Sequence, residues 1–481
     1  MGGNGLEGSL MSAVRAGDAE TVRALLEQGA DANTANTADG ADADGLPVLC
    51  VAVAAYDEPV AAALVEGGAD PDRVLPDGTT PLWRAVDGGS PAVFSAVLGD
   101  EPRLRLSEAD RERLLALARG WYGTGAAEEL RRRTGAPDRA GRDSAATVLV
   151  QDGEYNHVDQ VSLGGLVVRA GHGAILTSLE WAFRILTPVD ELIARAVGQP
   201  PEDRAVVDRV TQDPAAEAPF AEEHVNWSTV CWILSRRRSF ETWSAVVAHR
   251  HHPAPAHRRF VLDYLRTRSL TGVGSGYYKK KESEVLAAWA AEETDGETLA
   301  RVLDVFTEYE HPGQEAIGLR HAGHPDARVR REVPYALTRY EVARSPAARA
   351  AILALTRDPD AAVRISACTA SLRDEELLPE IIQALILLAE DTESGRRGAA
   401  ATLLAESGDR TPAVADALAA LLDDGSQLVR LEAAHGLLLR DDPRTAEAIE
   451  RVGPLDAGFE HDHRADALRQ WMWRRENPTA G

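Results

Sequence analysis

The feature that most constrains the fold is an internal period of about 33 residues, because repeats of this length form stacked units that share a continuous core. In the first third of the chain, Asp44, Gly45, Leu49 and Ala52 begin the pattern. They recur 33 residues later as Asp77, Gly78, Leu82 and Ala85. The next step of 33 residues places Leu115 and Ala118 in the same positions as Leu82 and Ala85. A single compact core is therefore not expected for this part of the chain.

The same pattern extends toward the N-terminus at a longer spacing. Gly29, Ala30 and Asp31 match Gly68, Ala69 and Asp70 at a shift of 39 residues. The six extra residues lie in a polar stretch, NTANTADGADADG, where an insertion costs little because loops tolerate added length. The repeats therefore begin near residue 10.

Each repeated position has a physical role in a helix pair. Asp-Gly favours a tight turn, and Thr80-Pro81 starts a helix with a hydroxyl cap and a preset φ. Small residues such as Ala52 and Ala85 let two helices approach closely, and Gly29 and Gly68 suit a left-handed residue after a helix. The segment Asp77-Gly78-Thr79-Thr80-Pro81-Leu82-Trp83-Arg84-Ala85, together with the Gly-Ala-Asp ends, resembles the ankyrin repeat. Trp83 departs from that pattern, which usually has a histidine there. The resemblance implies an ankyrin domain over residues 1–145, ending in a degenerate capping repeat at Leu115 to Asp138.

The C-terminal third carries a different series of the same length. Arg330 is followed at steps of 34, 33 and 33 residues by Arg364, Arg397 and Arg430. Leucines precede and alanines follow the later arginines at matching positions, namely Leu355, Leu388, Leu421, Ala367, Ala400 and Ala433. An Asp at the turn can cap the second helix, and the alanine allows close stacking of helices.

This series resembles the HEAT repeat, in particular the short bacterial type, as Pro325-Asp326-Ala327-Arg328-Val329-Arg330 and Pro359-Asp360-Ala361-Ala362-Val363-Arg364 illustrate. The segment His252-Pro253-Ala254-Pro255-Ala256-His257-Arg258-Arg259 resembles an earlier copy about two periods upstream. Apolar helical patterns at 226–234, 241–248, 260–265, 285–291 and 299–306 fit further helix pairs. A HEAT-like solenoid is therefore expected over residues 224–481.

A third kind of segment separates the two series. Residues 147–177 contain the short runs TVLV, HVDQVSL, LVVR and AILT, with glycine turns between them, a hairpin signature. We expect a small β-meander there, then helices near 178–184 and 188–197, and an acidic linker over 198–223. Residues 146–223 would thus be a junction module. The fold expected for the whole chain is mostly α, two α-solenoids joined by this module, and the order resembles a bacterial ankyrin and HEAT repeat protein family.

Composition narrows the setting in which this 481-residue chain works. The formal net charge is −24, which opposes a general nucleic-acid or anionic-membrane binder because phosphate groups need a positive surface. Cys50, Cys231 and Cys368 lie far apart, without metal or disulfide spacing, so a reducing compartment is expected. The N-terminus lacks a signal-peptide pattern, and no run of about 18 apolar residues exists. The expected location is the cytoplasm, with no membrane span.

Motifs for chemistry are weak throughout. Gly272-Val273-Gly274-Ser275-Gly276 lacks the Gly-Lys-Ser/Thr of a phosphate loop and is interpreted as a turn. His249, His251, His252 and His257 cluster, but no Cys or carboxylate follows nearby in sequence to complete a metal site, and surface or capping histidines are favoured. His157, Asp159 and His172 could form a catalytic cluster, although polar residues at a sheet rim are ordinary. No catalytic residue, cofactor or metal is predicted, and the protein is not expected to be an enzyme.

One charged segment stands out as a candidate binding site. Residues 225–281 carry eleven arginines and lysines against Glu241 and Asp263, a net charge of +9 in an otherwise acidic chain. The candidate partner-binding residues are Arg236, Arg237, Arg238, Arg250, Arg258, Arg259, Lys279, Lys280 and Lys281. If they share a groove, they could hold an acidic or phosphorylated protein. The tryptophans nearby also permit a nucleic acid. The alternative without function is that the arginines pair within the chain or are solvated.

The sequence predicts a non-enzymatic repeat scaffold for protein–protein interaction, since stacked repeats present extended surfaces. The alternatives are an enzyme or enzyme-maturation factor of the short-HEAT, lyase-like type, and a HEAT-like nucleic-acid-binding protein that uses residues 225–281. The two alternatives rest on likeness of fold, which is a weak guide to function.

Overall fold

The computed structural model describes residues 3–35, 45–99, 102, 104–124, 160–163, 166–169, 173–197, 225–271, 276–338, 343–456, 459 and 462–477. The chain divides into two compact units, Met1–Thr267 and Arg268–Gly481, and each is taken by itself below. The boundary between these units, at residues 267 and 268, lies within residues 224–481, the region expected to be HEAT-like. The predicted domain boundaries after residues 145 and 223 stay a prediction.

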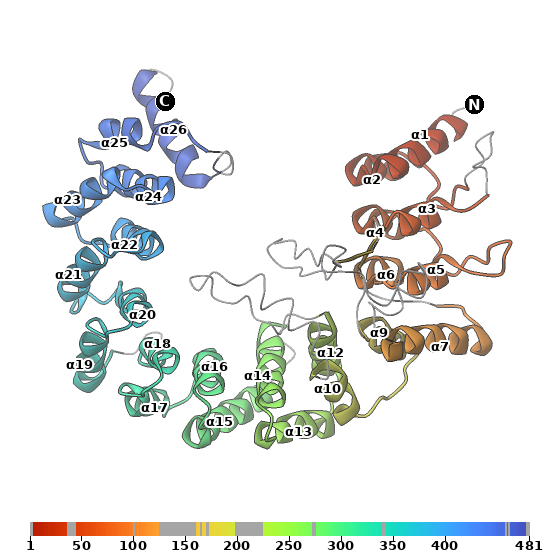
Figure 1. Cartoon of the computed structure of the whole chain (residues 1–481), viewed down its shortest axis with the longest axis horizontal. Coiled ribbons are helices and arrows are strands. Elements are labelled where there is room, and N and C mark those ends of the chain that lie inside the picture. Colours follow the sequence, from red (N-terminus) through yellow and green to blue (C-terminus); the bar gives the residue numbers. More distant parts are fainter. Residues whose placement is uncertain are drawn as a thin grey trace. The chain divides into compact units, whose positions relative to one another are not determined.

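The first unit begins with helical hairpins that stack in sequence order (Figure 1). Their helices are α1 (Gly3–Ala16), α2 (Ala19–Glu27), α3 (Val48–Ala54), α4 (Glu58–Glu66), α5 (Pro81–Gly88), α6 (Pro91–Leu98) and α7 (Glu108–Thr124). Helices α1 to α6 contact their hairpin partners, and α1 to α5 also contact the corresponding helix of the next hairpin. The repeated Ala52 and Ala85 are buried between helices, as the spacing predicts.

The ends of these helices follow the predicted caps. The Thr80 side chain accepts a hydrogen bond from the Trp83 backbone N–H at 3.0 Å, and Pro81 is the first helical residue. Gly29 and Gly68 have φ of 95° and 93°, the left-handed region in which a side chain would be strained. These glycines therefore end the second helix of their repeats.

Hydrogen bonds link the segments that follow the second helix of neighbouring ankyrin-like hairpins. The Asn33 side chain donates to the Gly68 carbonyl at 3.1 Å and accepts from the Asp70 N–H at 2.8 Å. The Arg73 guanidinium donates to the Asn33 carbonyl at 2.6 Å. This junction is thus joined by one amide side chain, one guanidinium and backbone groups, and the following junction has an ion pair of 2.5 Å between Arg105 and Asp70.

The expected β-meander is wrong. Within the described residues, the segment holds one antiparallel hairpin, β1 (Gln160–Leu163) with β2 (Leu166–Arg169), and no third strand. The run AILT begins a helix, α9 (Ala174–Ala182), after the left-handed Gly173. Its apolar side chains at Ile175, Leu176 and Leu179 are buried in the core of the first unit, at a helical spacing. Packing therefore overrides the β-branched character of the run. TVLV and the first part of HVDQVSL lie outside the described residues.

Further helices complete the first unit. They are α10 (Val189–Val197), α12 (Val225–Arg236), α13 (Phe240–Ala248), the short 3-10 helix η1 (His249–His251) and α14 (Pro255–Leu270), which crosses the division between the units. Helix α12 packs against α9 and α10, and α10 also contacts α13. The helical pattern expected at 226–234, 241–248 and 260–265 is confirmed.

The second unit is a stack of helix pairs. Its helices are α15 (Gly276–Glu292), α16 (Gly296–Thr307), α17 (Gln314–His321), α18 (Ala327–Ala336), α19 (Pro346–Leu355), α20 (Ala361–Ser371), α21 (Leu378–Leu388), α22 (Ser394–Glu406), α23 (Pro412–Ala420), η2 (Leu421–Asp423), α24 (Gln427–Leu438), α25 (Thr445–Val452) and α26 (His463–Glu476). The second helices of successive pairs contact one another in order from α16 to α24 (Figure 1). The repeated Ala367, Ala400 and Ala433 are fully buried there, as predicted. Across the described part of the chain, no helix is long and apolar enough to cross a bilayer.

Candidate functional site

The recurring arginines of the second unit fold back onto their own turn. Arg330 Nη1 donates to the carbonyls of His324 at 2.8 Å and Pro325 at 3.0 Å, six and five residues earlier. The same two bonds recur at Arg364, Arg397 and Arg430. These two carbonyls lie in the turn before the helix and cannot bond within it, so the guanidinium supplies their hydrogen-bond donor. This contact explains why the arginine repeats with the period.

The outer edge of each guanidinium reaches the next repeat. Arg330 bonds both carboxylate oxygens of Asp358, at 2.7 Å from Nε and 2.8 Å from Nη2. Arg397 bonds Asp424 in the same bidentate way, at 2.5 and 3.0 Å. The Asp358 and Asp424 side chains are only 7% and 5% exposed. We call Arg330, Arg364 and Arg397 with Asp358, Asp391 and Asp424 the arginine ladder.

Contacts with arginine lower the pKa of two carboxylates of the ladder. The hydrogen bond from Arg330 lowers the pKa of Asp358, and that from Arg397 lowers the pKa of Asp424. Because bidentate arginine–carboxylate pairs are among the stronger polar contacts, these two steps hold neighbouring repeats together.

The middle step of the ladder is looser. Arg364 reaches Asp391 through a single contact of 3.4 Å from Nη2. Asp391 is shared with Arg396, also at 3.4 Å, and its pKa is lowered first by the Glu393 backbone N–H. Among the described residues, Arg364 Nε has no hydrogen-bond partner, whereas the Nε of Arg330 and of Arg397 each bond a carboxylate. Arg364 therefore keeps donor capacity that the other two have used.

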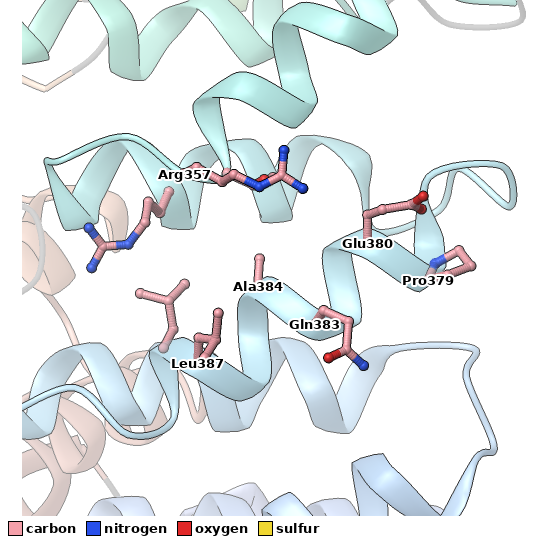
Figure 2. A pocket seen from close by; sticks show the side chains of 9 residues that line it. Arg357, Pro379, Glu380, Gln383, Ala384 and Leu387 are labelled. Atoms are coloured by element: carbon pink, nitrogen blue, oxygen red, sulfur yellow. The ribbon is translucent and has the colours of Figure 1, made fainter.

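A pocket of about 690 Å³ lies beside this loose step (Figure 2). It is formed by the turn after α19, by α20 and by the exposed side of α21. Its lining residues are Thr356, Arg357, Arg364, Pro379, Glu380, Gln383, Ala384, Leu387 and Leu388. Leu387 is 70% exposed, and Arg357 is exposed as well. Glu380 and Leu387 lie at opposite ends of the pocket in Figure 2.

The predicted basic residues are divided between the two units. The six arginines belong to the first unit and Lys279, Lys280 and Lys281 to the second. Arg236 is exposed, with its guanidinium 4.7 Å from the centre of the Trp232 ring, and Arg238 is exposed beside it. Lys279 and Lys280 are exposed, and Lys281 lies 5.0 Å from the centre of the Tyr277 ring.

The other arginines of this segment make contacts within the chain. Arg237 donates to the Thr187 carbonyl at 2.7 Å, and its burial lowers the pKa of the guanidinium. Arg250 donates to the Val247 carbonyl, and Arg259 is half-buried. Arg258 donates to the carbonyls of His252 and Pro253, as the arginines of the ladder do six and five residues back. This contact shows that residues 252–258 share the local geometry of the later repeats.

The predicted histidine cluster is real but is organised as a stack. The His252 and His257 rings lie 3.7 Å apart, and His249 Nδ1 is 3.2 Å from His257 Nδ1. His249 Nε2 lies 3.0 Å from Asp190. Burial, followed by the neighbouring histidines, lowers the pKa of His257 to about 4. Among the described residues, no group of three His, Cys, Asp or Glu side chains could hold a metal ion. His157, Asp159, His172 and residues 272–275 lie outside the described residues.

The structure contains two buried ion pairs that the sequence analysis did not predict. Arg195 on α10 bonds Glu180 at 2.8 Å, with Thr187 donating to the same carboxylate. In the second unit, Arg268 bonds Glu282 at 2.9 Å, and burial next to Glu282 raises the pKa of the Tyr309 hydroxyl. The partners are 14 or 15 residues apart and follow no repeat, so no sequence pattern could have paired them.

The cysteines belong to the interior. Cys50, Cys231 and Cys368 are free and buried. Cys368 is fully enclosed in α20, and burial raises the pKa of its thiol to about 12. A thiol so rarely ionised is a poor nucleophile, and Cys368 is therefore assigned to the core.

The stacked hairpins and the arginine ladder define a protein built from two kinds of helical repeat. Comparison with protein families makes the assignment: the family described as "Ankyrin repeats (3 copies)" matches residues 10–105, and the family described as "HEAT repeats" matches residues 352–438. The chain is therefore an ankyrin and HEAT repeat protein.

Other comparisons are more distant. No curated protein matches the chain. Among solved structures, the X-ray structure of the Escherichia coli protein YibA is similar at 13% identity, covering 56% of this chain and 98% of that protein. The TM-score is 0.37, too low to carry an argument about function.

Proposed function

We propose that this protein is a non-enzymatic scaffold that holds protein partners on its repeat arrays. The observation that carries the proposal is the presence of two different repeat families in one chain, ankyrin at 10–105 and HEAT at 352–438. Stacked repeats present extended surfaces whose outer positions vary without loss of the core, and this suits them to recognition rather than catalysis. The free, buried Cys50, Cys231 and Cys368 fit a reducing bacterial cytoplasm as the site of action.

The basic segment is the proposed contact for an acidic or phosphorylated partner. Its most accessible cations are Arg236 and Arg238 in the first unit and Lys279 and Lys280 in the second. Arg236 stacked on Trp232 resembles the arginine and aromatic composition of interface hot spots. Arg237, Arg250 and Arg258 are engaged with backbone carbonyls, so their contribution would be to position the segment. The net charge of −24 over the chain supports a protein partner over a nucleic acid.

Capture by the immobilised full chain tests the proposal. We expect partner proteins from the source cell to be retained, to elute as salt rises, and to be lost with the double variant Arg236→Glu, Arg238→Glu. The matched control is Arg23→Glu, Arg474→Glu, which makes the same charge change at two exposed positions away from the segment. Retention that is equal for both double variants would contradict a role for the basic segment. Retention that disappears after nuclease treatment would contradict a protein partner.

A further inference from the structure

We propose that the pocket beside the loose step of the ladder binds a peptide segment of a partner protein in which an apolar side chain is adjacent to a carboxylate. The apolar floor is Leu387, Leu388 and Ala384, and the cations are Arg357 and Arg364. Figure 2 shows Arg357, Ala384 and Leu387 around one hollow. This site lies in the HEAT array and is distinct from the basic segment.

The repeats on either side act as an internal comparison. Leu387 stands where the neighbouring repeats have Ala354 and Ala420, each directly before the leucine that anchors the helix. Arg357 stands where the next two repeats have Glu390 and Asp423. The departures put a large apolar side chain and a cation at this one step, although stacking of the array needs neither. Covering the 70% exposed Leu387 side chain with an apolar group of a ligand would remove apolar surface from water, which is favourable.

The two arginines that line the pocket favour a ligand with a carboxylate group. Arg357 is exposed, and within the described residues its guanidinium makes one hydrogen bond, to the Leu353 carbonyl, which is long at 3.5 Å. Arg364 makes both carbonyl bonds through Nη1, whereas its Nε and Nη2 edge has only a weak contact to Asp391, so this edge can donate to a ligand carboxylate while the carbonyl bonds remain. Two guanidinium groups over an apolar floor match an acidic residue next to an aliphatic or aromatic one.

The single carboxylate of the lining gives the peptide a direction. Glu380 is exposed near the start of α21, seven residues from Leu387 and so about 10 Å along the helix. It would repel an acidic group at its own end. The peptide carboxylate is therefore placed by Arg357, and a neutral or basic residue by Glu380. Because both Leu387 and Arg357 are open to solvent, the site suits a segment of chain lying across the surface rather than an enclosed small molecule.

Selection of random heptapeptides displayed on phage against the immobilised full chain tests this proposal. The enriched peptides are expected to place Asp or Glu next to Leu, Ile, Met or Phe. Synthetic versions of the enriched peptides should bind about tenfold more weakly to Arg357→Ala and to Leu387→Ala, because each variant removes one of the two contacts. Replacing the peptide's Asp by Asn should weaken binding to the native chain but make little difference to Arg357→Ala.

Controls separate this site from other surfaces. Arg320→Ala and Leu439→Ala remove an exposed arginine and a partly exposed leucine elsewhere in the same unit, and both should leave peptide affinity unchanged. Arg236→Glu, Arg238→Glu should also leave it unchanged, so loss of partner capture through the basic segment is a separate result. Enrichment of no peptide, of peptides without an acidic and apolar pair, or of peptides insensitive to both pocket variants would overturn the proposal.

Discussion

The two arrays join neighbouring repeats by different physical means at nearly the same spacing. In the ankyrin array, Asn33 links its turn to the next one through amide and backbone hydrogen bonds, and the ion pair of the following junction, Arg105 with Asp70, is largely exposed. In the HEAT array, Arg330 and Arg397 reach the next repeat through charged, mostly buried pairs. Amide contacts are indifferent to pH, whereas buried ions are costly if one partner is removed. The difference shows that a common period determines which positions of neighbouring repeats are in contact, but not which type of interaction stabilises that contact.

The largest expected effect comes from breaking one strong step of the ladder. Arg397→Met leaves the 5% exposed Asp424 carboxylate without its partner, and should cost about 2–4 kcal/mol of stability in the second unit. Denaturant unfolding, with hydrogen exchange at α22 and α24 to localise the change, would measure it. Arg364→Met should cost less, because its pair is a single 3.4 Å contact. Equal losses at Arg397 and Arg364 would remove the distinction between strong and loose steps.

The second effect tests whether packing is common to both arrays. Ala85 and Ala433 are each buried where helices approach closely, so Ala85→Leu and Ala433→Leu should each cost roughly 1–3 kcal/mol through overpacking. Thermal unfolding of the single variants would show the loss, and Ala400→Leu should behave like Ala433→Leu. Unchanged melting at both Ala400 and Ala433 would mean that close helix contact is not what the alanines provide.

A smaller effect is expected in the ankyrin array. Asn33→Ala removes the donor to the Gly68 carbonyl and the acceptor from the Asp70 N–H, and should cost about 1 kcal/mol because the site is only half-buried. Asn477→Ala, at an exposed position, is the control. Hydrogen exchange at the Asp70 amide would report the change locally. A loss as large as that of Arg397→Met would contradict the contrast between the arrays.

The smallest effect is the pH dependence of the ladder. The pKa of Asp424 is lowered in the folded protein, so the stability it contributes is present above the unfolded pKa and is lost as pH falls through the folded value. At pH 3.9, where an unfolded aspartate is half protonated, the loss is about 0.4 kcal/mol for this carboxylate. Unfolding curves between pH 7 and 3.5 should therefore bring the native chain and Arg397→Met closer together. Curves that stay parallel would show that this pair does not titrate with folding.

Much of the architecture could be predicted because each repeat contacts mainly its neighbours. The positions of Ala52, Ala85, Ala400 and Ala433 follow from the period alone, and the Thr80 cap follows from local chemistry. Residues 174–177 could not be predicted in this way. Ile175 and Thr177 are β-branched, yet the surrounding helices bury this segment as part of α9. Local propensity is weak compared with the burial of apolar surface.

The candidate sites were likewise predictable only in part from the sequence. The sequence identified the arginines at 236–259 and the recurrence of Arg330, Arg364 and Arg397 without assigning their contacts. Only the structure showed that the Arg258 guanidinium donates to a carbonyl six residues earlier, as Arg330 does. It also showed that the contact between Arg364 and Asp391 is weak and that Arg364 lines a pocket. The sequence by itself determined the period, the caps and the two repeat families, because stacking and capping act over a few residues or one repeat. The tertiary structure alone decided which carboxylate meets which guanidinium and which leucine stays exposed, because these features depend on how segments 27 or 28 residues apart pack against one another.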